Sequence, residues 1–332
     1  MRNPDLLAEA KDYRGRDEVP ADFDAFWDRQ ISSLSGLPDY QLIEKDFQIA
    51  GVTCYELVFE GTNQGRTYAR IVLPKSSKKV PIIFHFHGYM GRGWDWSDML
   101  AYTAAGYGVV SMDVRGQSGY SLDGGAPVRG NTVKGQIIRG AVDGPERLFY
   151  KDVYLDIYSL VEIVASLDLV DEERLSSYGA SQGGALALVA AALNPRIKQT
   201  VAIYPFMSDF RRVLEIGNTS EAYDELFRYF KFHDPFHETE DEIIQTLSYI
   251  DVKNMAHRIQ GSVRMITGLA DDVCYPITQF AIYNRLECTK EHHLMPEYEH
   301  EAMNVYVNDR VFNWLCGSKI DQPYLLEAFK DW

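Results

Sequence analysis

The stretch that decides the fold is residues 175–184, Leu-Ser-Ser-Tyr-Gly-Ala-Ser-Gln-Gly-Gly, which residues 185–193, Ala-Leu-Ala-Leu-Val-Ala-Ala-Ala-Leu, follow directly. The start of the first stretch has the pattern of a strand, and the second stretch consists of strong helix formers. Between them, Gly179, Ser181 and Gly183 form a G-x-S-x-G pattern, typical of a strained strand-to-helix turn that exposes a nucleophilic serine. Side chains at the two glycines would strike neighbouring backbone. The pattern therefore predicts a strand, a sharp turn and a helix, with Ser181 as the candidate nucleophile.

Strand-like and helix-like segments alternate around this turn. Residues 80–87, Val-Pro-Ile-Ile-Phe-His-Phe-His, form a nearly continuous apolar run, as expected for a central strand covered on both faces. Residues 99–105 indicate a helix, residues 108–114 the next strand, and residues 150–167 a long helix with apolar positions at i, i+3 and i+4. This order predicts the α/β class, with a mostly parallel central sheet and helices on both faces.

The chain of 332 residues is expected to form a single domain, 1–332, with two additions. Residues 40–74 contain three strand-like runs broken by glycines, which predict antiparallel strands at one edge of the sheet. An N-terminal extension of about residues 1–38 contains one amphipathic helix at 21–34. Residues 206–260, charged, aromatic and mostly helical, delay the next strand and predict a helical cap insertion.

Composition excludes several classes of function. The chain has 33 basic and 48 acidic residues and a net charge of −15, which repels nucleic acid and anionic lipid. Its four cysteines are scattered without a C-x-x-C pair, which favours reduced thiols over a disulfide or zinc framework. Residues 1–20 carry charges throughout and no stretch of 18 apolar residues occurs, so we expect neither secretion nor a membrane span. We therefore expect a cytoplasmic protein with no nucleic-acid or membrane partner.

A serine nucleophile needs a base and a residue that orients the base, in the chain order Ser, Asp, His. Asp271 and Asp272 follow the strand-like residues 263–267, and we take Asp271 as the orienting residue with Asp272 as the alternative. His300 lies in the loop before the last predicted helix, residues 304–315, and is the candidate general base. The three candidate catalytic residues are therefore Ser181, Asp271 and His300.

An oxyanion hole needs two N–H donors. The first should be the backbone N–H of Gln182, directly after the nucleophile, and the second that of Tyr89, after the strand at 80–87. For Tyr89, simple packing at a strand end is the alternative. The other histidines give weaker signals. His85 and His87 read as core or as support for the oxyanion loop, and the Pro235 between His233 and His237 argues against a metal pair there.

Several stretches together resemble the acetyl xylan esterase and cephalosporin C deacetylase group, carbohydrate esterase family seven. The matching stretches extend over most of the chain: Arg115-Gly116-Gln117, Arg139-Gly140, residues 143–150, Val153-Tyr154-Leu155-Asp156, residues 179–184, Phe280-Ala281-Ile282-Tyr283-Asn284 and His300-Glu301. The sequence departs from the pattern expected for this group at residues 275–278, Tyr-Pro-Ile-Thr, and at Glu299. Those departures bear on the shape of the substrate site rather than on the type of reaction.

The resemblance implies an α/β-hydrolase fold and hydrolysis of acetyl esters on small molecules, including acetylated xylo-oligosaccharides and cephalosporin C-type acetates. It implies no metal and no organic cofactor, and a homo-oligomer, a hexameric ring. It supports the same three catalytic residues and the N–H groups of Tyr89 and Gln182 as oxyanion donors, and it makes Arg115 and Gln117 structural.

Two other functions fit the same turn. A serine peptidase of the prolyl-oligopeptidase type shares the elbow and the order of the triad, although no propeller repeat precedes it here. A non-catalytic binding protein can share the fold, although such proteins typically lose a triad residue. Hydrolysis of acetyl esters compared with that of dipeptide amides would distinguish these alternatives.

Overall fold

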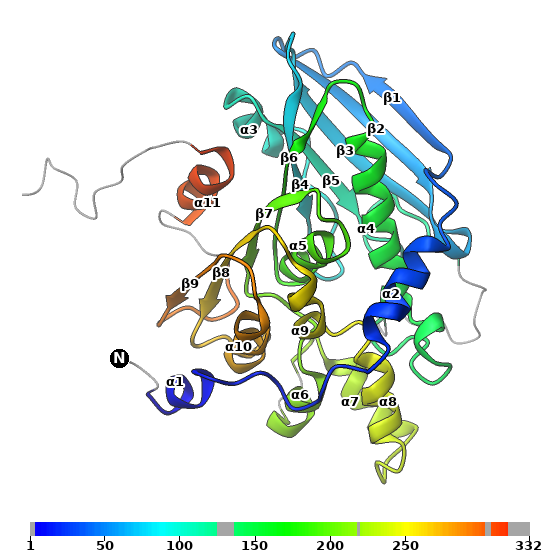
Figure 1. The fold of residues 1–332 in the computed structure, drawn as a ribbon, viewed down its shortest axis with the longest axis vertical. Helices are drawn as coiled ribbons and strands as arrows, with labels where there is room; N and C mark the ends of the chain where they lie inside the picture. The colour runs from blue at the N-terminus through cyan, green and yellow to red at the C-terminus, as the bar shows by residue number, and fades with distance from the viewer. Residues whose placement is uncertain (1–3, 125–135, 218–219, 303–306, 318–332) are drawn as a thin grey trace, which may run out of the picture.

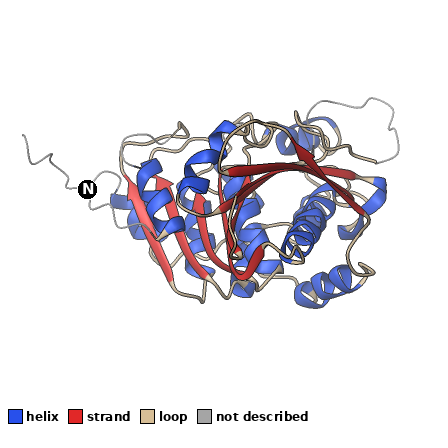
Figure 2. Ribbon diagram, turned by 90° about the horizontal axis from the view of Figure 1, so that it is seen from above, coloured by secondary structure: helices blue, strands red, loops and turns tan. Residues whose placement is uncertain are grey.

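The computed structural model describes residues 4–124, 136–217, 220–302 and 307–317. Within these ranges the strands form one twisted nine-stranded sheet in the order β1-β2-β3-β5-β4-β6-β7-β8-β9 (Figures 1 and 2). The strands are β1 Tyr40–Lys45, β2 Val52–Glu60, β3 Arg66–Pro74, β4 Val80–Phe86, β5 Gly108–Asp113, β6 Val170–Ala180, β7 Ile197–Ile203, β8 Ser262–Gly268 and β9 Lys290–Met295. From β5 to β9 neighbouring strands run parallel, and β1, β2 and β3 pair antiparallel at the edge, as predicted.

Helices cover both faces of this sheet. Those of the described residues are α1 Pro4–Ala10, α2 Phe23–Ser32, α3 Leu100–Ala104, α4 Phe149–Ala165, α5 Gln182–Leu193, α6 Phe210–Ile216, α7 Asp224–Phe232, α8 Glu240–Leu247, α9 Val252–Met255, α10 Pro276–Arg285 and α11 Val307–Cys316. Helices α2, α4, α5, α9 and α10 join the larger hydrophobic core on one face, whereas α3 and α11 join the smaller core on the other. The predicted α/β class with helices on both faces is therefore confirmed.

Burial explains why the central strand β4 and the helix α5 are apolar in sequence. All seven residues of β4 are buried, because the strand lies in the middle of the sheet between two helical layers. Helix α5 is apolar on every side and buried along its whole length, since it packs against β4, β6 and β7 and is covered by α4. The turn before α5 therefore lies in the buried centre of the molecule.

The N-terminal segment and the excursion between β7 and β8 pack against each other. Trp27 on α2 donates its indole N–H to the carbonyl of Tyr249 at 3.0 Å. The Tyr13 hydroxyl donates to the carboxylate of Asp209 at 2.6 Å. Helices α6 to α9 occupy the segment for which the sequence predicts a cap (Figure 1). The division into a body, an extension and a cap stays a prediction. In the described ranges no helix combines the length and the apolar character needed to cross a bilayer.

Candidate active site

The candidate residues follow the carboxyl ends of parallel strands, at one edge of the sheet. After β4 the chain runs to β5 on one side, and β6 lies on the other side of β4, so the strand order changes direction at this point. Ligands of open α/β sheets bind in the crevice at such a point. Tyr89 follows β4, Ser181 follows β6, Asp271 follows β8 and His300 follows β9. The topology thus brings residues far apart in the sequence to one place.

Ser181 has the strained backbone that the G-x-S-x-G pattern predicts. Its φ is 57° and its ψ is −121°, a conformation that non-glycine residues rarely adopt. A Cβ on Gly179 would lie 2.3 Å from the backbone of Gly183, and one on Gly183 would lie 2.0 Å from the carbonyl oxygen of Phe86. Only glycine fits at either position, because β4, β6 and α5 meet here backbone to backbone. The turn holds the serine at the amino terminus of α5.

Ser181, His300 and Asp271 form a continuous hydrogen-bonded chain. The Oγ of Ser181 lies 3.1 Å from Nε2 of His300, and Nδ1 of His300 lies 2.9 Å from Oδ2 of Asp271. These are the distances required between a nucleophile, its base and the group that orients the base. In this arrangement Nδ1 donates its N–H to the Asp271 carboxylate, and Nε2 is left to accept the proton of Ser181.

The second oxygen of Asp271 is held by its own loop. Oδ1 accepts the backbone N–H groups of Val273 at 2.9 Å and Cys274 at 2.8 Å. Asp271 is 3% exposed, whereas the neighbouring Asp272 is exposed to solvent. The structure thus places Asp271, and not Asp272, against the imidazole. The buried Cys274 also lies next to the nucleophile, with Sγ 4.0 Å from the Oγ of Ser181.

A buried polar network supports the Asp271 loop, and the sequence alone did not predict it. Gln279 on α10 donates its amide to the carbonyl of Cys274 at 2.5 Å and lies 3.4 Å from Oδ2 of Asp271. Its amide oxygen accepts from the Thr267 hydroxyl at 2.7 Å, which in turn lies 2.8 Å from Nε2 of His292. Burial lowers the pKa of His292 to about 3, so this imidazole stays neutral and donates one N–H to Thr267.

The Gln182 side chain links the turn to the end of β4. Its amide nitrogen donates to the carbonyl of His87 at 3.2 Å, and its amide oxygen accepts from the Tyr150 hydroxyl at 2.8 Å. The Gln117 amide pairs with it in both directions, at 2.7 and 3.1 Å. The backbone N–H of Gln182, in the first turn of α5, has no acceptor within the helix. The side chain thereby connects the first residue of α5 to the loop after β4, which contains Tyr89.

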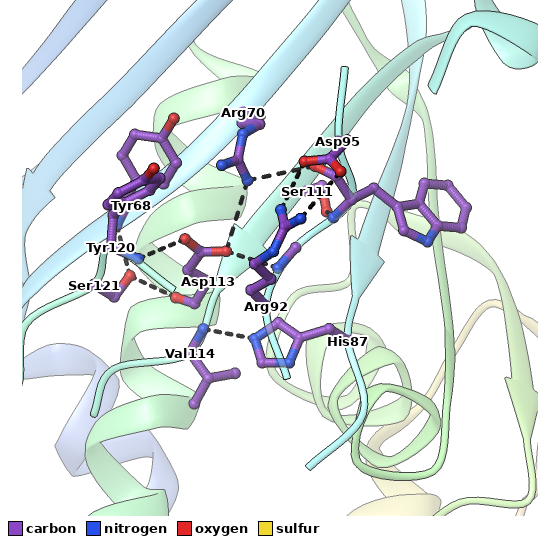
Figure 3. A network of polar contacts seen from close by, with 12 residues as sticks. Tyr68, Arg70, His87, Arg92, Asp95, Ser111, Asp113, Val114, Tyr120 and Ser121 are labelled. Atoms are coloured by element: carbon purple, nitrogen blue, oxygen red, sulfur yellow. Dashed lines mark hydrogen bonds and ion pairs between the residues drawn. The ribbon is translucent and has the colours of Figure 1, made fainter. Parts of the chain in front are cut away.

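The loop after β4 is also hydrogen-bonded to residues at the end of β5 (Figure 3). The N–H of Val114 donates to Nε2 of His87 at 3.0 Å, so the proton lies on Nδ1, which is 2.8 Å from the carbonyl oxygen of Gly88. Burial lowers the pKa of His87 and keeps the ring neutral. The buried carboxylate of Asp113 accepts the N–H of Gly93 at 2.7 Å, and its other oxygen accepts that of Tyr120 at 2.8 Å. His87 thus supports the candidate oxyanion loop, one of the two roles expected for it.

Arg115 lies in the interior and not among the reacting groups. Its guanidinium makes a bidentate pair with Asp156 at 2.7 and 2.6 Å, and it donates to the carbonyl of Thr62 at 2.8 Å. A Cβ on Gly61 or Gly65 would lie 2.4 Å or less from this pair. Arg115 therefore joins β5, α4 and the turn after β2, while Gln117 in the same motif contacts Gln182.

His233 and His237 lie on the excursion between β7 and β8, away from the triad. His233 stacks on Tyr229 with ring centroids 5.8 Å apart. His237 stacks on Phe230 at 4.5 Å and contacts Glu240 at 2.5 Å. Within the described ranges, no group of three or more His, Cys, Asp or Glu side chains is arranged to hold a metal ion.

Both the sequence and the structure of the chain are similar to those of known proteins. The family model of acetyl xylan esterase (AXE1) matches residues 1–318. The chain belongs to the acetyl xylan esterase family. The structure is similar to that of acetyl xylan esterase 1 from Thermoanaerobacterium sp. JW/SL YS485, with a TM-score of 0.90 and 42% identity, over 94% of this chain and 98% of that one. This similarity confirms the α/β-hydrolase fold that the resemblance implies.

Two further relatives extend the comparison. The structure of an acetyl xylan esterase from Paenibacillus sp. R4 is similar with a TM-score of 0.85 and 32% identity, over 93% of this chain and 98% of that one. Acetyl esterase Axe7A of Xylanibacter ruminicola is 27% identical over 288 residues, which cover 85% of this chain. The match spans 63% of the length of that relative.

Proposed function

We propose that the chain is a serine esterase that hydrolyses acetyl esters of small molecules through an acetyl-enzyme intermediate. The observation that carries the proposal is the hydrogen-bonded chain from Ser181 through His300 to Asp271, with separations of 3.1 and 2.9 Å, on a strained turn. Membership of the acetyl xylan esterase family supports acetyl esters as the substrate class.

In the first step of the proposed reaction, the Oγ of Ser181 attacks the acetyl carbonyl carbon while Nε2 of His300 takes the hydroxyl proton. The carbonyl oxygen becomes an anion, which the backbone N–H groups of Gln182 and Tyr89 would stabilise. The tetrahedral adduct then collapses. The C–O bond to the alcohol breaks, His300 returns its proton to the departing alcohol, and the acetyl group stays on Ser181.

In the second step water attacks the acetyl-enzyme and gives its proton to His300. The second tetrahedral adduct expels the Oγ of Ser181, which recovers the proton from His300, and acetate leaves. Asp271 holds the imidazole in one tautomer and stabilises its charged form in both steps. The two N–H groups from the Val273 and Cys274 backbone keep this carboxylate fixed, so little rearrangement is needed when charge develops.

The substrates we propose are acetylated xylo-oligosaccharides and cephalosporin C-type acetates, as the family resemblance implies. The net charge of −15 favours neutral sugar esters over polyanionic substrates. We further propose a cytoplasmic location and a hexameric ring, which the resemblance also implies. Sedimentation of the purified protein, for a chain of 37.9 kDa, would distinguish a hexamer from a monomer.

The experiment compares the wild-type protein with Ser181→Ala on a chromogenic acetyl ester, acetylated xylobiose, cephalosporin C and a dipeptide amide. We expect turnover of the acetyl esters and a loss of roughly 10³-fold or more in Ser181→Ala, because the triad acts as a unit. Ser33→Ala, an exposed serine at the end of α2, is the matched control and should keep wild-type turnover.

Two results would contradict the proposal. Unchanged turnover by pure, folded Ser181→Ala would remove the serine mechanism. Cleavage of the dipeptide amide in preference to every acetyl ester would favour the peptidase alternative.

A further inference from the structure

A buried carboxylate on the excursion between β7 and β8 contacts the candidate oxyanion loop. The hydroxyl of Tyr89 lies 3.0 Å from both carboxylate oxygens of Glu225. Glu225 is in the first turn of α7 and is only 6% exposed, although the rest of that helix carries charged groups at the surface. A carboxylate is costly to bury and is retained where its hydrogen bonds are made. The contact with Tyr89 is one of the hydrogen bonds that offset this cost.

Glu225 is itself held from a second side. One of its oxygens, Oε1, accepts the backbone N–H of Ile137 at 2.6 Å. The preceding residue, Gln136, donates to the carbonyl of Gly116 at 2.8 Å, and its amide oxygen accepts from Gln117 at 2.9 Å. These hydrogen bonds hold the Glu225 carboxylate in place and connect it, through Gln136 and Gln117, to Gln182 beside the nucleophile.

Tyr89, whose hydroxyl contacts Glu225, is joined to the turn that carries the reacting serine. The ring centroids of Tyr89 and Phe206 are 5.7 Å apart. The backbone N–H of Phe206 donates to the carbonyl of Ser181 at 3.1 Å. Gly88, directly before Tyr89, has its carbonyl 3.4 Å from the amide nitrogen of Gln182. These contacts join Tyr89 to the turn that carries Ser181, so its ring is a candidate wall of the space for the acyl group of an ester.

We infer that Glu225 is a positioning residue that sets which acyl groups the enzyme accepts, by holding the Tyr89 ring in place through its hydroxyl. The inference rests on the proposed esterase function and adds to it a residue outside the triad and the oxyanion donors.

The physical reason is the freedom of an aromatic side chain that is fixed at one end only. The Tyr89 ring packs against Phe206, and the hydrogen bond of its hydroxyl adds a second constraint on rotation about χ1 and χ2. When Glu225 accepts from the hydroxyl, the ring stays in one orientation, and a longer acyl chain must overlap with it. Overpacking of this kind outweighs the gain from burying further methylene groups. Without the acceptor, the ring can move aside and longer chains can enter.

The experiment measures kcat/KM for the acetyl and butyryl esters of one chromogenic alcohol and compares their ratio among variants of the full chain. Glu225→Ala removes the acceptor, Tyr89→Phe removes the donor, and the double variant removes both. Glu225→Gln is the conservative variant, because its amide oxygen can accept from Ile137 while its NH₂ group donates to the Tyr89 oxygen. Asp224→Asn is the matched control. This neighbouring carboxylate on α7 is partly exposed and pairs with Arg228 at 2.6 Å.

We expect the butyryl-to-acetyl ratio to rise about tenfold or more in Glu225→Ala and in Tyr89→Phe, since hydrogen bonds to charged groups contribute at least a factor of this size. The double variant should show no further rise, because both changes break the same contact. Glu225→Gln should stay near the wild-type ratio, and Asp224→Asn should equal it. A merely structural role for Glu225 would lower both rates together and leave the ratio unchanged.

Two kinds of failure are distinguishable. If the wild-type protein hydrolyses acetyl esters but the ratio is the same in Glu225→Ala and Tyr89→Phe, the inference is wrong and the proposed function stands. If Glu225→Ala is too unstable to assay, Tyr89→Phe tests the same contact from the other side, and an unchanged ratio there also overturns the inference. If the wild-type protein hydrolyses no acetyl ester, the proposed function fails and the inference falls with it.

Discussion

Replacing Asp271 by asparagine should disable the triad through a single misplaced N–H group. Oδ1 of Asp271 accepts two backbone N–H groups, at 2.9 and 2.8 Å, so the amide oxygen of asparagine would take that position. The NH₂ group would then occupy the site of Oδ2, 2.9 Å from Nδ1 of His300. Because both groups cannot donate, the imidazole would carry its proton on Nε2, facing Ser181, and could no longer accept one from the hydroxyl.

The expected cost follows from that geometry. A serine hydrolase with the wrong histidine tautomer loses about 10⁴ in kcat, and we expect roughly 10³ to 10⁴ for Asp271→Asn. Stability should change little, because the substitution is isosteric and the loop keeps its backbone hydrogen bonds. The assay is steady-state turnover of a chromogenic acetyl ester near pH 8, with circular dichroism as the check on folding.

Asp272→Asn is the matched control, one residue along the same loop, with its side chain exposed. We expect its turnover to stay within a small factor of the wild type. If Asp272→Asn lost more activity than Asp271→Asn, the orienting role would move to Asp272. If folded Asp271→Asn kept wild-type turnover, the tautomer argument itself would be wrong.

Three further results are expected. Asp156→Asn should lower the free energy of unfolding, measured in urea, by about 3–5 kcal/mol, because it leaves the buried Arg115 charge without its bidentate partner. As the control, Asp171→Asn breaks an exposed pair with Arg174 and should lower it by about 1 kcal/mol or less. The pKa of His292 is lowered to about 3, so the unfolded chain binds more protons below about pH 6.5. Stability should therefore fall with decreasing pH, and His292→Gln should reduce that slope by up to about 1.4 kcal/mol per pH unit between roughly pH 6 and 4. Burial raises the pKa of the Cys274 thiol, so iodoacetamide at about pH 8 should label it only after unfolding, as peptide mapping can show.

The parts of the fold that follow from local pattern could be predicted from the sequence. The turn at residues 179–183 could be predicted, because a Cβ on Gly179 or Gly183 would overlap with neighbouring backbone. The β4 run is continuously apolar because both of its faces are buried. His300 and the pair Asp271 and Asp272 could be proposed from the sequence, because they follow predicted strands in the chain order Ser, Asp, His. Chain order could not choose between the two aspartates, and only the structure shows Asp271 2.9 Å from Nδ1 of His300 while Asp272 is exposed.

The residues that support the site could not be found in this way. Gln279, Thr267 and His292 are ordinary polar residues in the sequence, and only the packing of α10 against β8 and β9 brings them together under Asp271. Glu225 follows Asp224 in the first turn of an amphipathic helix, where a surface position is the natural expectation. Its contact with Tyr89 joins residues 136 positions apart, and no local spacing signals such a pair.

The proposed mechanism requires that Ser181 carries an acetyl group during each turnover, and this intermediate can be trapped. The protein is mixed with an acetyl ester of a good leaving group, quenched in acid during the first turnover, digested and analysed by mass spectrometry. We predict that the peptide containing Ser181 gains the mass of one acetyl group, in step with a stoichiometric burst of alcohol, and that the gain disappears after deacylation. Turnover without any acetylated Ser181, or with the acetyl group on another residue, would show that Ser181 is not the nucleophile.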